Sequence, residues 1–170
     1  MAKAEHAHVI GLISDTHGQL RAGVHDALRG VELILHAGDV GGDEILDELS
    51  LIAPVEAVYG NTDASGNPRL SAQIVRDIGG VVIQVQHGHE SGRLTADALL
   101  ERFTADVLVY GHTHKQSVTR REGRLVFNPG AAGSRRCHLM PTVARLTIGE
   151  GVAEVVRVSL PGTGRTINPD

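Results

Sequence analysis

Short apolar runs alternate with amphipathic stretches in the first third of the chain. Apolar residues dominate 8–14, 31–35 and 55–59, and glycine or polar residues bound each run, which predicts three buried strands. Between them, 19–29 and 43–51 carry apolar side chains at helical spacing, which predicts two amphipathic helices. This βαβαβ order predicts a parallel sheet with helices packed on it.

The pattern becomes strand-rich further along the chain. Gly79-Gly80 separates the apolar runs 73–78 and 81–86, as in a two-residue β-hairpin. One more helix is expected over 95–103, with Thr95 capping its N-terminus. The remaining expected strands are 107–110, 117–121, 125–127, 143–148 and 152–158, with turns at 122–123 and 149–151. We therefore expect two sheets face to face, with helices on the outer faces.

A single domain is expected over residues 1–170, because no repeat, low-complexity tract or linker divides the chain. Its hydrophobic fraction of 41% and charged fraction of 21% are those of a globular protein. The core is expected over about 8–158. The tail 161–170 is rich in Gly, Pro and Thr and is expected to be loose.

Composition argues against several classes of partner. The formal net charge of -4 and the absence of Trp do not favour binding of a nucleic-acid duplex or base stacking. The polar N-terminus and the lack of an apolar run of about 20 residues argue against a signal region or a membrane span. Because Cys137 is the only cysteine, no intramolecular disulfide can form, and we expect a cytoplasmic location.

Five of the expected strands are each followed by a loop that combines glycine with Asp, Asn or His. These loops are Asp15-Thr16-His17-Gly18, His36-Ala37-Gly38-Asp39, Gly60-Asn61-Thr62-Asp63, His87-Gly88-His89 and Gly111-His112-Thr113-His114. Ligands in open α/β sheets bind beyond the carboxyl ends of the strands. If the five loops share one edge, their polar side chains converge on one site, which core packing alone does not explain.

The residue types in these loops indicate a metal site. Imidazole, carboxylate and amide donors together suit Mn, Fe, Zn or similar ions, and the absence of cysteine argues against a structural zinc site. The candidate ligands are Asp15, His17, Asp39, Asn61, His87, His112 and His114. Seven ligands exceed the need of one tetrahedral ion. Two ions roughly 3.5–4 Å apart would use them well and would clamp a phosphoryl group during its transfer.

These motifs, in this order over residues 8 to about 158, resemble the calcineurin-like metallophosphoesterases, and most of all their small bacterial and archaeal phosphodiesterase branch. The resemblance implies a four-layer α/β/β/α sandwich of two mostly mixed sheets. It also implies ligand roles. Asp15, His17 and His114 would hold one metal ion, Asn61, His87 and His112 would hold the other, and Asp39 would bridge them.

The implied activity is hydrolysis of phosphodiester bonds by in-line attack of a hydroxide that bridges two divalent metal ions. Asp39, Asn61 and His87 would be catalytic. Mn is the first expectation for the metal, with Fe, Zn, Ni or Mg as alternatives. The substrate would be a small phosphoester, with nucleotide-derived compounds among the candidates. Two alternatives stay open, a phosphomonoesterase or nucleotide phosphatase and a non-catalytic interaction scaffold of the same fold, and a homo-oligomer also stays open.

Two positions depart from the family pattern. Asn128-Pro129-Gly130 resembles the family's closing turn near the site, which Ser normally follows directly, but here 131–133 intervene before Ser134. Many family members carry, after the Asn, a His that can protonate the leaving group, whereas this chain has Thr62. Because help from a general acid contributes roughly 10²–10⁴-fold, we expect weak action on esters with poor leaving groups.

Further residues near the motifs are weaker candidates for orienting a ligand or binding substrate, namely His36, Asp63, His89, Arg135 and Arg136. His36 could equally be an ordinary core histidine, and the two arginines could form a solvated basic turn. Asn61 itself lies in good turn chemistry, Gly-Asn-Thr. Surface positions are expected for the histidines outside the motifs, His6, His8, His25 and His138. Tyr59 and Tyr110 are expected in the core.

Overall fold

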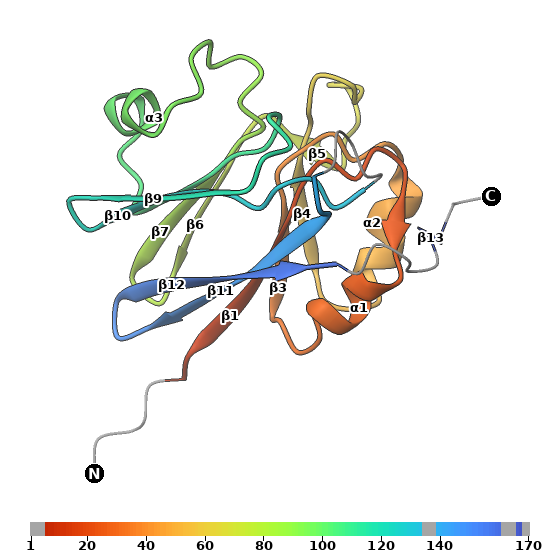
Figure 1. Cartoon of the computed structure of the whole chain (residues 1–170), viewed down its shortest axis with the longest axis horizontal. Coiled ribbons are helices and arrows are strands. Elements are labelled where there is room, and N and C mark those ends of the chain that lie inside the picture. The colour runs from red at the N-terminus through yellow and green to blue at the C-terminus, as the bar shows by residue number, and fades with distance from the viewer. Residues whose placement is uncertain (1–5, 134–138, 161–165, 168–170) are drawn as a thin grey trace.

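The computed structural model describes residues 6–133, 139–160 and 166–167, and two main sheets dominate it (Figure 1). The first sheet has the strand order β12 (Val152–Ser159), β11 (Thr142–Gly149), β1 (His8–Ile13), β3 (Leu33–His36), β4 (Val55–Val58) and β5 (Leu70–Ser71). The second has the order β6 (Ile74–Ile78), β7 (Val81–Val85), β8 (Val107–Val109), β10 (Arg124–Asn128) and β9 (Ser117–Arg121).

Both sheets are mixed, and their parallel strands lie at the centre. Strands β1, β3, β4 and β5 are mutually parallel, and β11 and β12 extend the sheet in antiparallel fashion. In the second sheet β7, β8 and β10 are parallel, whereas the edge strands β6 and β9 are antiparallel. The carboxyl ends of β1, β3 and β4 therefore lie at one edge of the first sheet, and those of β7 and β8 at one edge of the second.

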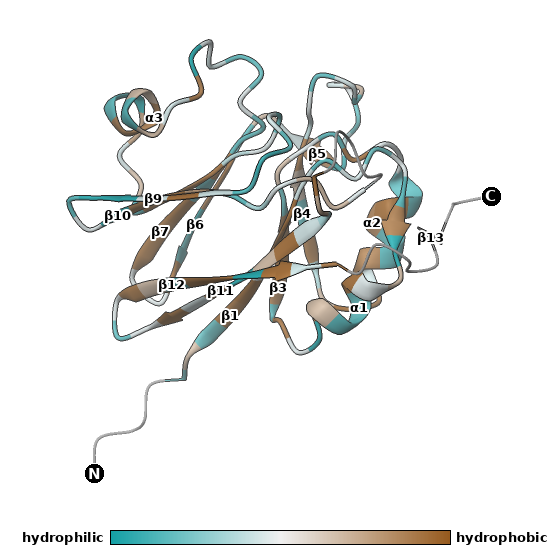
Figure 2. Ribbon diagram, in the orientation of Figure 1, coloured by the Kyte–Doolittle hydropathy of each residue, from teal (hydrophilic) through white to brown (hydrophobic). Residues whose placement is uncertain are grey.

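Helices cover the outer face of each sheet, which confirms the four-layer α/β/β/α order. Helices α1 (Gly23–Ala27) and α2 (Asp43–Ser50) pack on the first sheet through side chains such as Val24 and Leu49. Helix α3 (Ala96–Arg102) packs on the second sheet through Leu99 (Figure 1). The largest apolar cluster lies between the sheets, and Figure 2 shows hydrophobic residues along their strands.

Local turn and cap chemistry was predicted correctly at two places. Gly79 and Gly80 have φ of 57° and 81°, the left-handed pair that a type I′ hairpin turn requires between β6 and β7. At the start of α3, Thr95 accepts a hydrogen bond from the amide of Ala98 at 3.2 Å through its hydroxyl. The turn sets the pairing of β6 with β7, and the cap sets the start of α3, and both depend on local contacts alone.

The helix predicted over 19–29 is wrong in its first part. Leu20–Arg21 form a short strand, β2, that pairs with β13 (Thr166–Ile167), and α1 spans only Gly23–Ala27. The Arg21 guanidinium is buried and donates to the carbonyl of Gly133 at 2.9 Å. This long-range contact and the pairing with β13 override the local helical pattern. The tail was expected to be loose, but its residues 166–167 are paired.

Strand β5 was not predicted either, because two residues carry no periodic signal. It nevertheless extends the first sheet beside β4. Among the described residues, no helix has the length and apolar character that crossing a membrane requires.

Candidate metal centre

The loops at the carboxyl ends of both sheets bring acidic and imidazole side chains together in two groups. The first group is Asp15, His17, Asp39 and His114, and the second is Asp39, His87 and His112. In each group, one potential ligand atom per residue lies within 4.8 Å of all the others. Asp39 belongs to both groups, so the two clusters are adjacent and share one carboxylate.

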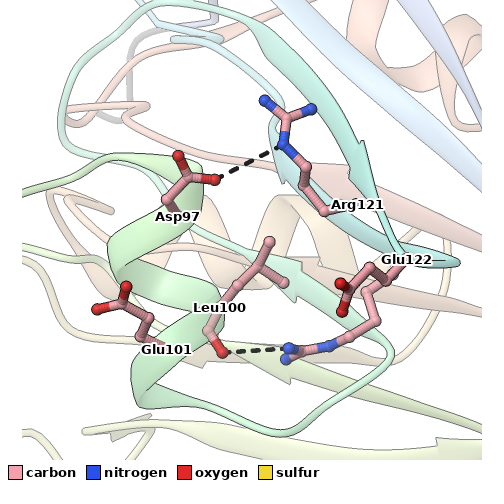
Figure 3. Close-up of a pocket in the computed structure, with 6 residues that line it drawn as sticks. Asp97, Leu100, Glu101, Arg121 and Glu122 are labelled. Atoms are coloured by element: carbon pink, nitrogen blue, oxygen red, sulfur yellow. Dashed lines mark hydrogen bonds and ion pairs between the residues drawn. The ribbon is translucent and has the colours of Figure 1, made fainter.

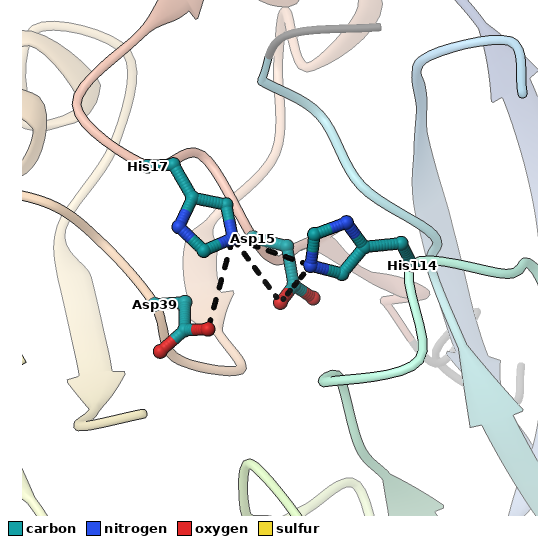
Figure 4. A group of neighbouring side chains, drawn as sticks. All are labelled: Asp15, His17, Asp39 and His114. Atoms are coloured by element: carbon teal, nitrogen blue, oxygen red, sulfur yellow. Dashed lines mark hydrogen bonds and ion pairs between the residues drawn. The ribbon is translucent and has the colours of Figure 1, made fainter. Parts of the chain in front are cut away.

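The first group joins β1, β3 and the loop after β8 (Figure 4). Nε2 of His114 lies 3.3 Å from Oδ1 of Asp15 and 3.2 Å from Nε2 of His17. Nε2 of His17 lies 3.7 Å from Oδ2 of Asp39. The two carboxylates are buried and the two imidazoles are partly buried. Side chains separated by almost 100 residues thus point at one small volume.

The second group joins β3, β4, β7 and β8. Nε2 of His87 lies 3.3 Å from Oδ2 of Asp39 and 3.1 Å from Oδ1 of Asn61. The same Asn61 oxygen lies 3.1 Å from Nδ1 of His112. The structure therefore brings together all seven residues that the sequence proposed as ligands.

An unusual backbone conformation marks the same residues. Of the seven described residues other than glycine with positive φ, five are candidate ligands: Asp15 (53°), His17 (47°), Asp39 (53°), His112 (70°) and His114 (61°). The other two, Glu122 and Glu150, lie in hairpin turns. A left-handed conformation costs a non-glycine residue of order 1–3 kcal/mol. Such strain gathered at one place indicates that the side-chain directions serve function rather than folding.

Backbone hydrogen bonds hold the strained loops against one another. The amide of Asp15 donates to the carbonyl of Gly38 at 3.0 Å, and the amide of His17 donates to the carbonyl of Asp39 at 2.9 Å. Glycine is required where a loop passes a carboxylate, since a Cβ built at Gly60 would overlap the Asp39 side chain. The ligand loops are thus tied to one another before any ion binds.

Asp63, a weaker candidate from the sequence, lies behind the centre and orders its loops. Its carboxylate accepts hydrogen bonds from the backbone amides of Val40 and Gly41, both at 3.0 Å, and from that of Gly60 at 2.9 Å. These three amides flank the loops that carry Asp39 and Asn61. One carboxylate therefore fixes the spacing between two ligand loops.

His36 is fully buried and joins the loops after β1 and β3. Its Nδ1 accepts the amide hydrogen of Gly38 at 3.1 Å, so Nε2 carries the proton and donates to the Thr16 hydroxyl at 2.9 Å. Thr16 in turn donates to the carbonyl of Val40 at 2.8 Å. Burial lowers the pKa of His36 to about 4, against the opposing charges of Asp15 and Asp63. His36 is a neutral positioning residue that contacts the loops rather than the predicted ions.

The turn at Asn128-Pro129-Gly130 supports the loop that carries His112 and His114. The Asn128 amide group donates to the carbonyl of Gly111 and to the Thr113 hydroxyl, both at 3.0 Å. The residues inserted after this turn extend the support, because the amide of Ala132 donates to the carbonyl of Ser14 at 2.9 Å. The insertion therefore packs against the strand end that carries Asp15.

The sequence analysis missed Ser14, whose hydroxyl donates to Oδ2 of Asp15. Oδ2 also accepts the amide hydrogen of His112 at 3.2 Å. Both contacts orient the carboxylate so that Oδ1 faces His17 and His114. Nothing in the apolar pattern of the first strand distinguishes Ser14, so only the structure reveals this role.

The donor set fits metal ions for two structural reasons. Oδ1 of Asp15 is buried and has no hydrogen-bond partner among the described residues, although an unsatisfied buried carboxylate oxygen is costly. Nδ1 of His87 lies 2.7 Å from the carbonyl of Ala37 and must donate to it, which directs Nε2 at oxygens of Asp39 and Asn61. A bound ion would replace the proton that Nε2 donates to Asp39 in the metal-free chain. A cation satisfies all of these acceptor atoms at once.

The charge state of the shared carboxylate supports the same reading. Burial acts to raise the pKa of Asp39, but hydrogen bonds from His87 and Thr62 outweigh it and hold that pKa well below its usual range. Burial acts to lower the pKa of His87, and the Asp39 and Asp15 carboxylates reverse the shift and raise it. Asp39 is therefore an anion at neutral pH and able to bind cations.

The remaining candidates have mixed outcomes. The His89 ring lies beside the centre, with its centroid 5.4 Å from that of His87 and 6.1 Å from that of Tyr59. Tyr59 is only partly buried there, so its expected core position is wrong, whereas Tyr110 is buried and its hydroxyl contacts Oγ of Ser117 at 2.9 Å. Arg135, Arg136 and His138 lie outside the described residues. His6 and His8 contact Glu32, and His25 contacts Glu48, so these three contribute nothing to the centre.

The fold and the candidate ligand groups are those of the metallophosphoesterase class. The family model of the calcineurin-like phosphoesterase superfamily domain matches residues 9–151. The chain belongs to this family.

Individual relatives agree with this membership. A probable metallophosphoesterase of Methanothermobacter thermautotrophicus is 37% identical in an alignment 172 positions long. The alignment covers 90% of this chain and 94% of that protein. A phosphodiesterase of Methanocaldococcus jannaschii is 30% identical over 139 residues, covering 71% of this chain and 82% of that protein. Vps29 of Chaetomium thermophilum superposes with a TM-score of 0.81 at 17% identity, covering 94% of this chain and 95% of that one, and supports the fold alone.

Proposed function

We propose that the chain hydrolyses small phosphodiesters with the help of two divalent metal ions. The observation that carries the proposal is the position of Asp39, whose carboxylate belongs to both groups of candidate ligands. The similarity to a phosphodiesterase of Methanocaldococcus jannaschii favours diesters within the family. Mn is the first choice for the metal because the donor set mixes imidazole with carboxylate and amide oxygens.

The two ions would be held by the two groups of side chains described above. Asp15, His17 and His114 would hold one of them, Asn61, His87 and His112 would hold the other, and Asp39 would contribute to both. When bound, the ions supply Lewis acidity and lower the pKa of a coordinated water toward neutrality.

The chain's own residues prepare this centre in two ways. The amide and hydroxyl of Thr62 donate to Oδ1 of Asp39 at 3.0 and 2.8 Å, which leaves Oδ2 directed toward His17 and His87. The Ala37 carbonyl fixes the tautomer of His87, so its Nε2 is directed toward the shared carboxylate. Both devices orient donor atoms before substrate arrives, and such preorganisation lowers the reorganisation needed during the reaction.

Substrate would approach the centre from the side of the second group, because Asn61 and His112 are exposed while Asp15 and Asp39 are buried. The phosphate would then meet the amide and imidazole of these residues at the solvent side. An open side of this kind accepts both substituents of a diester without displacing a buried element.

Metal-dependent assays test the proposal. The protein is stripped with EDTA, reloaded with Mn²⁺ and supplied with bis(p-nitrophenyl) phosphate or p-nitrophenyl phosphate. We expect metal-dependent hydrolysis with the diester at least about tenfold faster in kcat/KM. Faster hydrolysis of the monoester would favour a phosphomonoesterase. Loss of all hydrolysis with metal bound would favour a non-catalytic scaffold.

The position of Thr62 predicts a strong dependence on the leaving group. Its hydroxyl already donates to Asp39, so it has no proton to give to a departing alkoxide. General acid help is worth roughly 10²–10⁴-fold, and its loss is felt most with poor leaving groups. We expect log kcat/KM for a series of phenyl phosphodiesters to fall steeply as the pKa of the phenol rises. A flat dependence would show that another group supplies the proton.

A further inference from the structure

A cavity of about 170 Å³ lies beside the candidate metal centre, on the outer side of the end of β7. Its walls include Gln86, His87, His89, Ser91, Arg102 and Phe103. His87 connects the two places, because it is one of the residues that line the cavity and its Nε2 faces Asp39. A molecule in the cavity therefore lies one side chain away from the candidate ligands.

Two residues of the cavity wall each carry a buried polar atom without a hydrogen-bond partner. Only five buried side-chain nitrogen or oxygen atoms in the described part of the chain lack a hydrogen bond, and Nε2 of Gln86 and Nδ1 of His89 are two of them. A third is Oδ1 of Asp15 in the metal centre. Because native proteins satisfy the great majority of buried polar groups, each exception calls for a ligand, a water or an ion.

A neighbouring glutamine shows that the lack of a partner is specific to Gln86. Gln84 precedes Gln86 by two positions and so projects from the same face of the strand. Their exposures are nearly equal, 8% for Gln84 and 9% for Gln86. Yet the Gln84 amide donates to Oε1 of Gln73 at 3.1 Å, whereas the Gln86 amide nitrogen has no acceptor. The amide nitrogen therefore has a hydrogen-bond acceptor at Gln84 and has none at Gln86, although both glutamines lie on the same face.

A larger cavity, of about 400 Å³, lies between α3 and the β9–β10 hairpin, and its two arginines already have partners on its wall (Figure 3). Asp97 lies 3.6 Å from Nε of Arg121, and Arg124 donates to the carbonyl of Leu100 at 3.1 Å. None of the unpartnered buried atoms found in the described residues lies on its wall. The smaller cavity is the one whose chemistry calls for a ligand.

The size and lining of the smaller cavity define what it can hold. A cavity of about 150 Å³ accommodates benzene, so this one takes a single six-membered ring rather than a whole nucleotide. Phe103 offers an apolar surface, and Gln86 on the same wall carries an amide nitrogen without an acceptor, which a carbonyl on the occupant would satisfy. Small-molecule sites commonly combine an apolar lining with a few placed polar groups in this way. A planar ring with carbonyl acceptors, of the size of a pyrimidine base, satisfies both demands.

We propose that this cavity binds the ring of one ester substituent of the substrate, a ring of pyrimidine size whose carbonyl accepts a hydrogen bond from Gln86. The inference rests on the proposed phosphodiesterase function, since the ring would be tethered to the phosphate at the metal centre. His89, which also lines the cavity beside His87, would offer a second hydrogen bond. Gln86 would then determine specificity without touching the reacting atoms.

The test compares two esters with the same leaving group. The Mn²⁺-loaded protein is assayed with the p-nitrophenyl ester of thymidine 5′-monophosphate and with methyl p-nitrophenyl phosphate. The measured quantity is the ratio of their kcat/KM values. In Gln86→Leu this ratio should fall about tenfold, the effect of one lost hydrogen bond to a buried donor, and the change should lie in KM for the thymidine ester.

Two further variants make the result independent of any folding defect. Gln84→Leu is the matched control, and its ratio should equal that of the unmodified protein. Ala72→Phe places a bulky ring at an exposed residue on the cavity wall and should lower the ratio as Gln86→Leu does. An unchanged ratio in both Gln86→Leu and Ala72→Phe, or an equal fall in Gln84→Leu, overturns the ring subsite alone. Failure of the unmodified protein to hydrolyse either ester overturns the phosphodiesterase function and the subsite with it.

Discussion

The two ligand groups around Asp39 differ in burial and in backbone conformation. In the first group Asp15 is fully buried, and Asp15, His17 and His114 all adopt positive φ. Apart from the shared and buried Asp39, the second group has Asn61 and His112 exposed and His87 buried, and only His112 of these three adopts positive φ. The first group is thus built into the folded chain, whereas the second faces solvent.

From this difference we expect the two halves of the centre to bind their ions with different affinities. Loops tied by backbone hydrogen bonds hold the first group in place, so little ordering is left for ion binding to accomplish. Exposed ligands must be ordered on binding and compete with water. We therefore expect the first half to bind its ion more tightly and the second half to exchange its ion and meet the substrate.

The largest expected effect comes from removing the shared carboxylate. In Asp39→Ala both halves lose a ligand, so both ions should be lost together with activity. A metal ion contributes several kcal/mol to charge stabilisation in the transition state, so kcat should fall by at least about 10³-fold. Metal analysis and the diester assay measure the two effects.

Asp97→Ala is the control for this variant, because Asp97 is an exposed carboxylate on α3 that contacts only Arg121 among the described ion pairs. It should keep both metal content and activity. Full activity in Asp39→Ala would remove the bridging role and, with it, the link between the two halves.

A pair of variants separates the two halves of the centre. Asn61→Ala removes an exposed ligand and should leave one ion bound per chain, with activity lowered about 10²-fold or more. His17→Ala removes a ligand of the ordered half and should weaken the tighter ion. Mass spectrometry under native conditions counts the ions in each variant. If Asn61→Ala and His17→Ala both weaken the binding of the same ion and by the same factor, the two halves of the centre are not distinct.

The pH dependence of stability tests how the ordered half is held. The pKa of His36 in the folded chain is lowered to about 4, below its unfolded value near 6.5. Its contribution is therefore fully present above pH 6.5 and is lost as the pH falls toward 4, because the unfolded chain takes up the proton first. Over that interval the metal-free protein should lose about 3 kcal/mol of unfolding free energy.

Urea unfolding at pH 7, 6, 5 and 4 in the presence of EDTA measures this loss. His36→Asn keeps a polar side chain without a titrating ring, and its stability should change less over the same interval. Equal slopes for both proteins would show that His36 is not held neutral by the fold.

Most of the fold and all seven candidate ligands were within reach of the sequence because both rest on local patterns. Apolar runs marked the strands, and glycine beside Asp, Asn or His marked the loops. The helix predicted over 19–29 was wrong in its first part because a pairing with residues 166–167 competes with its local pattern. Tyr59 was misplaced because an apolar run does not reveal which of its ends leaves the core.

The supporting contacts could not be predicted because they depend on long-range geometry. The three amides that converge on Asp63, the tautomer of His36 and the unpartnered nitrogen of Gln86 each involve chain segments brought together only by folding. These contacts decide how rigid each half of the centre is. Sequence patterns therefore selected the candidate ligands, and the structure shows how the two halves of the candidate centre differ.

Calorimetric titration of the metal-free protein with Mn²⁺ tests the dinuclear centre most directly. We predict two ions per chain in two resolved steps, the tighter one weakened by His17→Ala and the weaker one abolished by Asn61→Ala. Binding of a single ion, or of none, would contradict a centre built around a shared Asp39.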